Sequence, residues 1–166
     1  MRDSSEIDAL ERLHEILRKA SVPGIEAGST HVRFSPLEKD GFHVGLYVVD
    51  GLYTVYYEGW HEEVDGSENA IRAFLFGLTD RARLRVLERG GFPYRWMFES
   101  LDGSAWTPIS ETGLLFFKFW SSKRELLLQN RVLSPDMFGA SIAPEPTARH
   151  IAARPHAGAC RSASTY

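Results

Sequence analysis

Cysteine is almost absent from this chain of 166 residues. Cys160 stands alone, so no internal disulfide and no cysteine-based metal site can form. Long hydrophobic runs are missing too: no apolar stretch approaches the roughly 18 residues that suggest a membrane span. The first residues, MRDSSEIDALERL, carry charge where a secretion signal has an apolar core. We therefore expect a cytoplasmic protein with no membrane segment.

An excess of one charge is also lacking. The net charge of −3 gives no strong field of the kind expected of a general nucleic-acid-binding protein. The distribution is uneven, since residues 1–68 hold 14 acidic and 6 basic residues, whereas residues 69–131 hold 6 acidic and 10 basic residues. A hydrophobic fraction of 43% in a chain of this length predicts one globular domain with a sizeable core.

The clearest structural signal is a β-hairpin between Phe42 and Val64. Two runs rich in Val, Tyr, Leu and Thr flank Asp50-Gly51, a pair that accepts the positive φ angles of a two-residue type I′ turn. In the resulting register Val49 faces Leu52, and His43 faces Glu58. Alternation then predicts an apolar face made of Phe42, Val44, Leu46, Val48, Tyr53, Val55 and Tyr57. The second face would carry His43, Gly45, Tyr47, Thr54, Tyr56, Glu58, Trp60 and Glu62.

Two details of the remaining pattern leave alternatives open. Gly59 could mark a bulge or a bend, which would reverse the faces of residues 60–63. Residues 82–86 alternate as a strand does, with a continued helix as the competing interpretation. A capping-box pattern, Asp65 followed three residues later by Glu68, predicts the start of a helix.

The pattern as a whole predicts an α+β fold with the element order α-β-β-β-α-β-β-β-β. The expected helices cover residues 4–20 and 65–79, and the expected strands cover residues 31–35, 42–49, 52–60, 82–86, 94–101, 113–120 and 124–130. We expect a single domain over 1–133, with a mainly antiparallel sheet of six to seven strands and two helices packed on one face. Residues 134–166 are rich in Pro, Ala and Ser, which predicts a flexible C-terminal tail.

His43 and Glu58 form the candidate catalytic pair. A carboxylate bonded to an imidazole raises its basicity and selects its tautomer, so the pair could act as a general base. A solvated pair beside half-exposed aromatic residues is the simpler interpretation, because no nucleophile can be placed there. His61 and Glu62 suggest metal ligation, but neighbours on a strand point to opposite faces, so we predict no metal site and no cofactor.

A basic and aromatic strand face is the second candidate. Arg83, Arg85 and Arg89 would share it with Tyr94, Trp96 and Phe98 across the Gly90-Gly91 turn. Such a surface can bind single-stranded nucleic acid, or it can stabilise the sheet by packing guanidinium groups on rings. The modest local charge favours stabilisation.

The leading functional hypothesis is a small non-catalytic binding or adaptor protein. Its contact residues would be Tyr47, Tyr56 and Trp60, with Arg85 and Trp96 on the second candidate surface. The partner would be another protein or a second copy of the chain, and a small-molecule ligand is a further option. The alternative is a small hydrolase or isomerase that uses His43 and Glu58, and nucleic-acid binding through Arg83, Arg85 and Arg89 is a weaker one.

Overall fold

The computed structural model describes residues 4–114 and 120–134. Two helices and nine strands lie in this part of the chain. In chain order they are α1 (Ser4–Lys19), β1 (Ile25–Ala27), β2 (His31–Phe34), β3 (Val44–Val49), β4 (Leu52–Tyr57), β5 (Trp60–Val64), α2 (Ser67–Phe76), β6 (Ala82–Arg89), β7 (Phe92–Asp102), β8 (Ala105–Gly113) and β9 (Lys123–Leu128).

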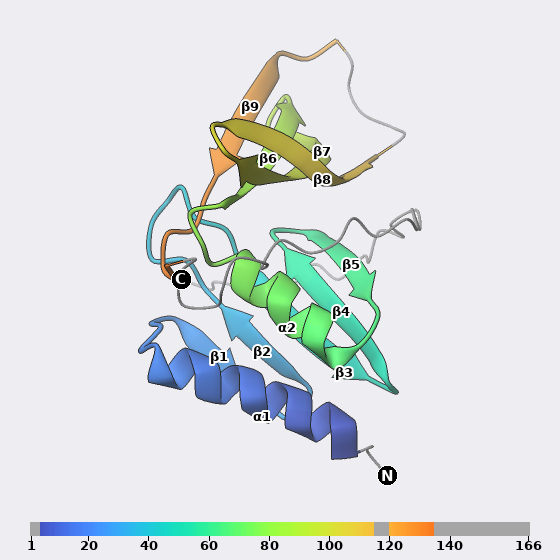
Figure 1. Ribbon diagram of the computed structural model, residues 1–166. Helices are drawn as coiled ribbons and strands as arrows, with labels where there is room; N and C mark the ends of the chain where they lie inside the picture. The colour runs from blue at the N-terminus through green and yellow to red at the C-terminus, as the bar shows by residue number, and fades with distance from the viewer. Residues whose placement is uncertain (1–3, 115–119, 135–166) are drawn as a thin grey trace, which may run out of the picture.

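The strands form two antiparallel sheets. Sheet 1 has the order β1-β2-β3-β4-β5, and sheet 2 has the order β8-β7-β6-β9. Figure 1 shows both helices beside sheet 1, while sheet 2 lies at the other end of the molecule. The predicted α+β class and the two helices on one sheet face are confirmed. The strands are divided between two sheets, since β6 starts a new sheet after α2.

The β3–β4 hairpin has the predicted register. Asp50 and Gly51 adopt φ angles of 50° and 78°, which close a two-residue turn. Val49 pairs with Leu52, and Val44 pairs with Tyr57. The Glu58 N–H donates to the His43 carbonyl at 3.1 Å, so the hydrogen bonding between the two chain segments continues beyond the ends of β3 and β4.

The expectation that Trp60 and Glu62 share a face with Tyr47 and Tyr56 is wrong. Glu58 and Gly59 adopt φ angles of 35° and 85°, and they form a second tight turn. The alternative left open at Gly59, a bulge or a bend that reverses the faces of residues 60–63, is thus the one that gives the observed faces. This turn makes Trp60 the partner of Tyr57, so Trp60 faces the core and is only 6% exposed. His61 and Glu63 take the outward positions, because they pair with Tyr56 and Thr54.

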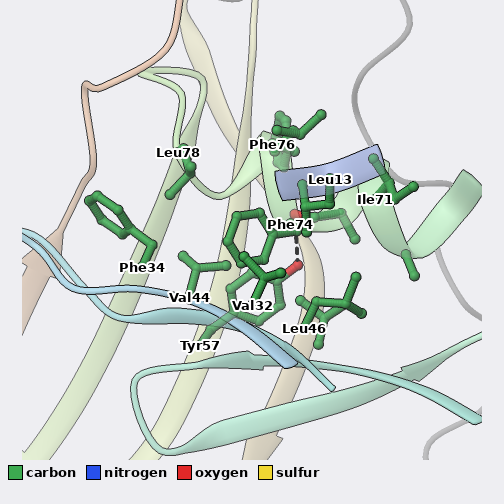
Figure 2. Close-up of a cluster of buried hydrophobic side chains, with 14 of the residues drawn as sticks. Leu13, Val32, Phe34, Val44, Leu46, Tyr57, Ile71, Phe74, Phe76 and Leu78 are labelled. Atoms are coloured by element: carbon green, nitrogen blue, oxygen red, sulfur yellow. Dashed lines mark hydrogen bonds between the residues drawn. The ribbon is translucent and has the colours of Figure 1, made fainter. Parts of the chain in front are cut away.

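The core lies between the inner face of sheet 1 and the two helices. Figure 2 shows its central cluster, which joins Leu13 of α1, Phe74 of α2 and inward residues of β2, β3 and β4. Phe98 of β7 extends this core into sheet 2. The centroid of its ring lies 4.2 Å from the ring centroid of Tyr57 and 5.8 Å from that of Phe76. The two sheets therefore share one hydrophobic core.

Asn130 holds the segment after β9 against the rest of the fold. It is 3% exposed, and its amide donates to the carbonyls of Phe42 and Gly77, both at 2.9 Å. Its side-chain oxygen accepts from the Phe42 N–H at 3.1 Å. Next to it, the N–H groups of Val132 and Leu133 donate to the Leu78 carbonyl. These bonds connect sheet 2 to the end of α2 and to the segment that leads into β3.

Several other predicted elements are confirmed or corrected. The helix over 4–20 and the strand over 82–86 are confirmed as α1 and β6. The capping box is wrong: α2 starts at Ser67 without a side-chain cap bond, and Glu68 pairs with Arg12 of α1. Most of the predicted strand over 113–120, and the tail from residue 135 onward, lie outside the described residues. The short strands β1 and β5 and the long strand β8 were not predicted.

We predict that Asn130→Ala destabilises the protein by about 3 kcal/mol, because it leaves buried backbone groups of Phe42 and Gly77 without their partner. Urea unfolding followed by tryptophan fluorescence measures this loss. Asn69→Ala is the matched control, since Asn69 is exposed and makes one bond, to the Asp65 carbonyl. Equal losses for the two variants would contradict the role of Asn130.

The burial of the Tyr57 hydroxyl predicts that the folded protein loses stability in alkaline solution. Burial raises the pKa of its hydroxyl well above the usual range, and the charge of Glu62 adds to this effect. The hydroxyl donates to the Ala73 carbonyl at 3.1 Å. Above about pH 10 the unfolded chain releases this proton while the folded protein keeps it, so the stability that the hydroxyl contributes is present below that pH and is lost above it.

The test compares the wild type with Tyr57→Phe by urea unfolding at pH 8 and pH 10.5. At pH 8 we expect the variant to be less stable by about 1 kcal/mol, and at pH 10.5 we expect this difference to shrink. Tyr56→Phe serves as the control, because Tyr56 is half-exposed. A difference between wild type and Tyr57→Phe that is the same at both pH values would contradict the prediction.

Candidate functional site

The outer face of sheet 1, opposite the helices, carries a row of four aromatic rings. We call His31, Tyr47, Tyr56 and His61, one from each of β2 to β5, the aromatic ladder. His31 stacks on Tyr47 at 5.4 Å between ring centroids, Tyr47 meets Tyr56 edge-on at 4.9 Å, and Tyr56 lies 5.1 Å from His61. Each ring is partly exposed, so the ladder forms a continuous aromatic surface.

The register of the strands in sheet 1 explains the aromatic ladder. His31 pairs with Tyr47, and Tyr56 pairs with His61, while the residues beside them on each strand point into the core. The two predicted binding residues Tyr47 and Tyr56 are therefore neighbours on one face. The two histidines were missed: the alternation of Val32 and Phe34 places His31 outward, and the place of His61 follows from the Glu58-Gly59 turn.

A hollow lies beside the ladder at Gly45. Gly45 pairs with Arg33 on one side and with Tyr56 on the other. A methyl group at this position would lie 2.9 Å from Cε2 of Tyr47, because the Tyr47 ring leans over the glycine. The hollow has a volume of about 220 Å³, and Arg33, Tyr47, Tyr56, His43 and Glu58 line it.

His43 and Glu58 lie at one end of this hollow, side by side as predicted. His43 Nδ1 is 2.8 Å from Glu58 Oε2, and the His43 backbone N–H donates to the same oxygen at 2.9 Å. The side chains are 61% and 41% exposed, so water screens the pair. Ser35 also lines the hollow, but among the described residues no hydrogen bond joins its hydroxyl to His43.

The charges on the outer face are mainly acidic. Strand register places Glu26 and Glu63 on this face together with one basic residue, Arg33, and Glu58 lines the hollow on the same face. The Arg33 guanidinium lies 4.0 Å from the Glu26 carboxylate, so part of its charge is offset within the protein. With the histidines neutral, the remaining surplus is negative.

Apolar side chains continue this surface to the tip of the hairpin. Val49 and Leu52 pair across β3 and β4 beside the Asp50-Gly51 turn. They are 54% and 59% exposed, so together they form a small apolar patch on the surface. The outer face therefore has an apolar end, an aromatic middle and a charged end.

The expectation that Arg83 and Arg85 share a face with Trp96 and Phe98 is wrong. The register between β6 and β7 shifts at Leu87/Glu88, since Leu87 pairs with Arg95 and Glu88 pairs with Pro93. Tyr94 is the extra residue of a β-bulge, and it moves every later residue of β7 to the opposite face. Trp96 and Phe98 pair with Val86 and Leu84, on the face opposite the arginines.

Arg83 and Arg85 instead surround a buried carboxylate. Glu99 is 2% exposed; its Oε2 accepts from Arg83 Nε at 2.7 Å, and its Oε1 lies 3.0 Å from Arg85 Nε. The Arg83 guanidinium also covers the ring of Trp106 at 4.2 Å from its centroid. Arg89 donates to the Ser121 carbonyl at 3.1 Å. These contacts engage the arginines within the fold, as expected for a stabilising role.

Comparisons with known proteins add no relative: the chain matches no protein-family model, no curated protein and no solved structure. Within residues 4–114 and 120–134, no group of three His, Cys, Asp or Glu side chains is arranged to hold a metal ion. The helices in this part of the chain include none with the length and apolar character needed to cross a membrane.

We predict that Glu99→Gln destabilises the protein by about 3 kcal/mol, because it removes the carboxylate that pairs with Arg83 and leaves Arg85 with its more distant partner, Glu125, at 3.5 Å. Glu111→Gln, which removes the partner of Arg95 in an exposed pair, should cost less than about 1 kcal/mol. Denaturant unfolding of both variants provides the measurement. A Glu99→Gln protein as stable as Glu111→Gln would show that this cluster contributes little.

Proposed function

We propose that this protein is a small non-catalytic binding protein and that the outer face of sheet 1 is its contact surface. The observation that carries the proposal is the half-exposed aromatic ladder, which continues into exposed Val49 and Leu52 on a face opposite both helices. Its partner is another protein or a second copy of the chain. The single cysteine, Cys160, fits a protein that works in the cytoplasm.

The composition of the face supports a protein partner. Tyrosine combines a large rigid ring with a polar hydroxyl and is enriched at contact surfaces. Tyr47 and Tyr56 project from paired central strands of sheet 1, so little conformational entropy is lost when a partner covers them. Trp60 was expected on the contact surface, but it belongs to the core. His61, which pairs with Tyr56, lies on the outer face in its place.

Catalysis by His43 and Glu58 is the second candidate, favoured by their 2.8 Å contact. The two side chains are 61% and 41% exposed, so water is not excluded from them and a general base gains little from its surroundings. A hydrolase would require turnover of simple ester or amide substrates that His43→Ala abolishes. Because the His43 and Glu58 side chains are exposed to water, we rank catalysis below binding.

The test compares Tyr56→Ala with Phe92→Ala, an exposed aromatic residue of sheet 2. Each variant and the wild type are immobilised, and the proteins retained from a lysate of the source cells are quantified, while light scattering reports self-association. We expect Tyr56→Ala alone to lose a specific partner or the dimer, with an unchanged circular dichroism spectrum. Equal retention by all three proteins, together with an unchanged mass, would overturn the proposal.

A further inference from the structure

We propose that the Gly45 hollow takes one arginine side chain from a basic segment of the partner protein. This inference rests on the proposed function, and it adds the chemistry that the contact surface recognises. The hollow measures about 220 Å³, below the roughly 300–1,000 Å³ of a small-molecule pocket. Its size suits a single long side chain that enters from an opposing surface.

The walls of the hollow favour a guanidinium group. Tyr47 and Tyr56 approach edge-on at 4.9 Å, so two aromatic rings of different orientation border the same space. A planar cation is attracted to the face of such a ring, and a guanidinium group is more weakly hydrated than an ammonium group. Gly45 lies beneath the Tyr47 ring and sets its position, because a larger residue there would push this ring away.

Glu58 supplies the opposite charge. Its Oε2 is held by the His43 imidazole and backbone, which fixes the carboxylate at the end of the hollow. An arginine that lies along the tyrosine rings can donate to the other oxygen, Oε1. Charge-assisted bonds between guanidinium and carboxylate groups are among the strong ones in proteins.

The surrounding charge favours a basic partner over an acidic one. An acidic side chain could reach Arg33, but it would then lie beside Glu58 and Glu26, and Arg33 already faces Glu26 at 4.0 Å. The outer face has an acidic surplus, since it carries Glu26, Glu58 and Glu63 together with Arg33. This field attracts a basic segment from a distance and repels an acidic one.

The experiment is an NMR titration of the ¹⁵N-labelled full chain with N-acetyl-arginine methylamide. N-acetyl-glutamate methylamide, at the same concentrations and ionic strength, is the comparison probe. We expect saturable shifts of the Gly45, Tyr47 and Tyr56 amides with the arginine probe and at least tenfold weaker effects with the glutamate probe. No saturable shift at these amides, or a stronger response to glutamate, would overturn the inference.

Three variants locate the binding. Gly45→Ala displaces the Tyr47 ring that borders the hollow, and Glu58→Gln removes the negative charge, so each should weaken arginine binding at least tenfold. Glu63→Gln, on the same face but outside the lining of the hollow, should bind within twofold of the wild type. If Gly45→Ala does not fold, the comparison of Glu58→Gln with Glu63→Gln still shows whether arginine binds at the hollow. Unchanged binding by Glu58→Gln would contradict the assigned site.

The two proposals fail separately. If Tyr56→Ala loses its partner while the arginine probe does not bind at Gly45, the contact surface stands and the arginine assignment is wrong. If the probe binds but Tyr56→Ala retains every partner, the hollow is a cation site and the outer face is not the contact surface.

Discussion

The register of β3 against β4 is the constraint on which the rest of the structure depends. The Asp50-Gly51 turn sets it, and burial of Val44, Leu46 and Tyr57 against α2 prevents a shift by one residue. A shift would move all of these side chains into water. The same register turns Gly45 outward with Tyr47 and Tyr56, so the core and the outer face are determined by one set of pairings.

Both helices of the described part of the chain pack on the inner face of sheet 1, so neither of them covers the outer face. Sheet 2 does not add to the outer face: it meets the inner side of the fold through Phe98 and Asn130. One face of this sheet packs in the core, and no helix or strand of residues 4–114 and 120–134 covers the other face, which makes the sheet a suitable support for a contact surface. The ladder and the hollow are local consequences of that arrangement.

Much of the fold could be predicted from the spacing of apolar residues along the sequence and from the residues that favour turns. The Asp50-Gly51 pair and the alternation around it predicted the central hairpin and the meeting of His43 with Glu58, both confirmed. What could not be predicted depends on single residues that reverse a face. Gly59 closes a turn with Glu58 and sends Trp60 inward, and the Tyr94 bulge separates Arg85 from Trp96.

The reason for these errors is physical. A strand has a period of two, so one extra or missing residue exchanges its faces completely. Local sequence does not specify whether Gly59 bends a strand or reverses it, because the choice depends on the burial of Trp60 against Tyr57 and Phe98. His31 joins the candidate site through its pairing with Tyr47, a contact between residues 16 positions apart.

If the proposed contact surface is correct, a protein partner covers the outer face of sheet 1 in the cell. Site-specific photo-crosslinking is the decisive experiment, with a benzophenone amino acid placed in turn at position 56 on the outer face and at position 92 on sheet 2. We expect a discrete cross-linked product from position 56 that is absent from position 92. No product from position 56, or the same products from both positions, would contradict the proposed contact surface.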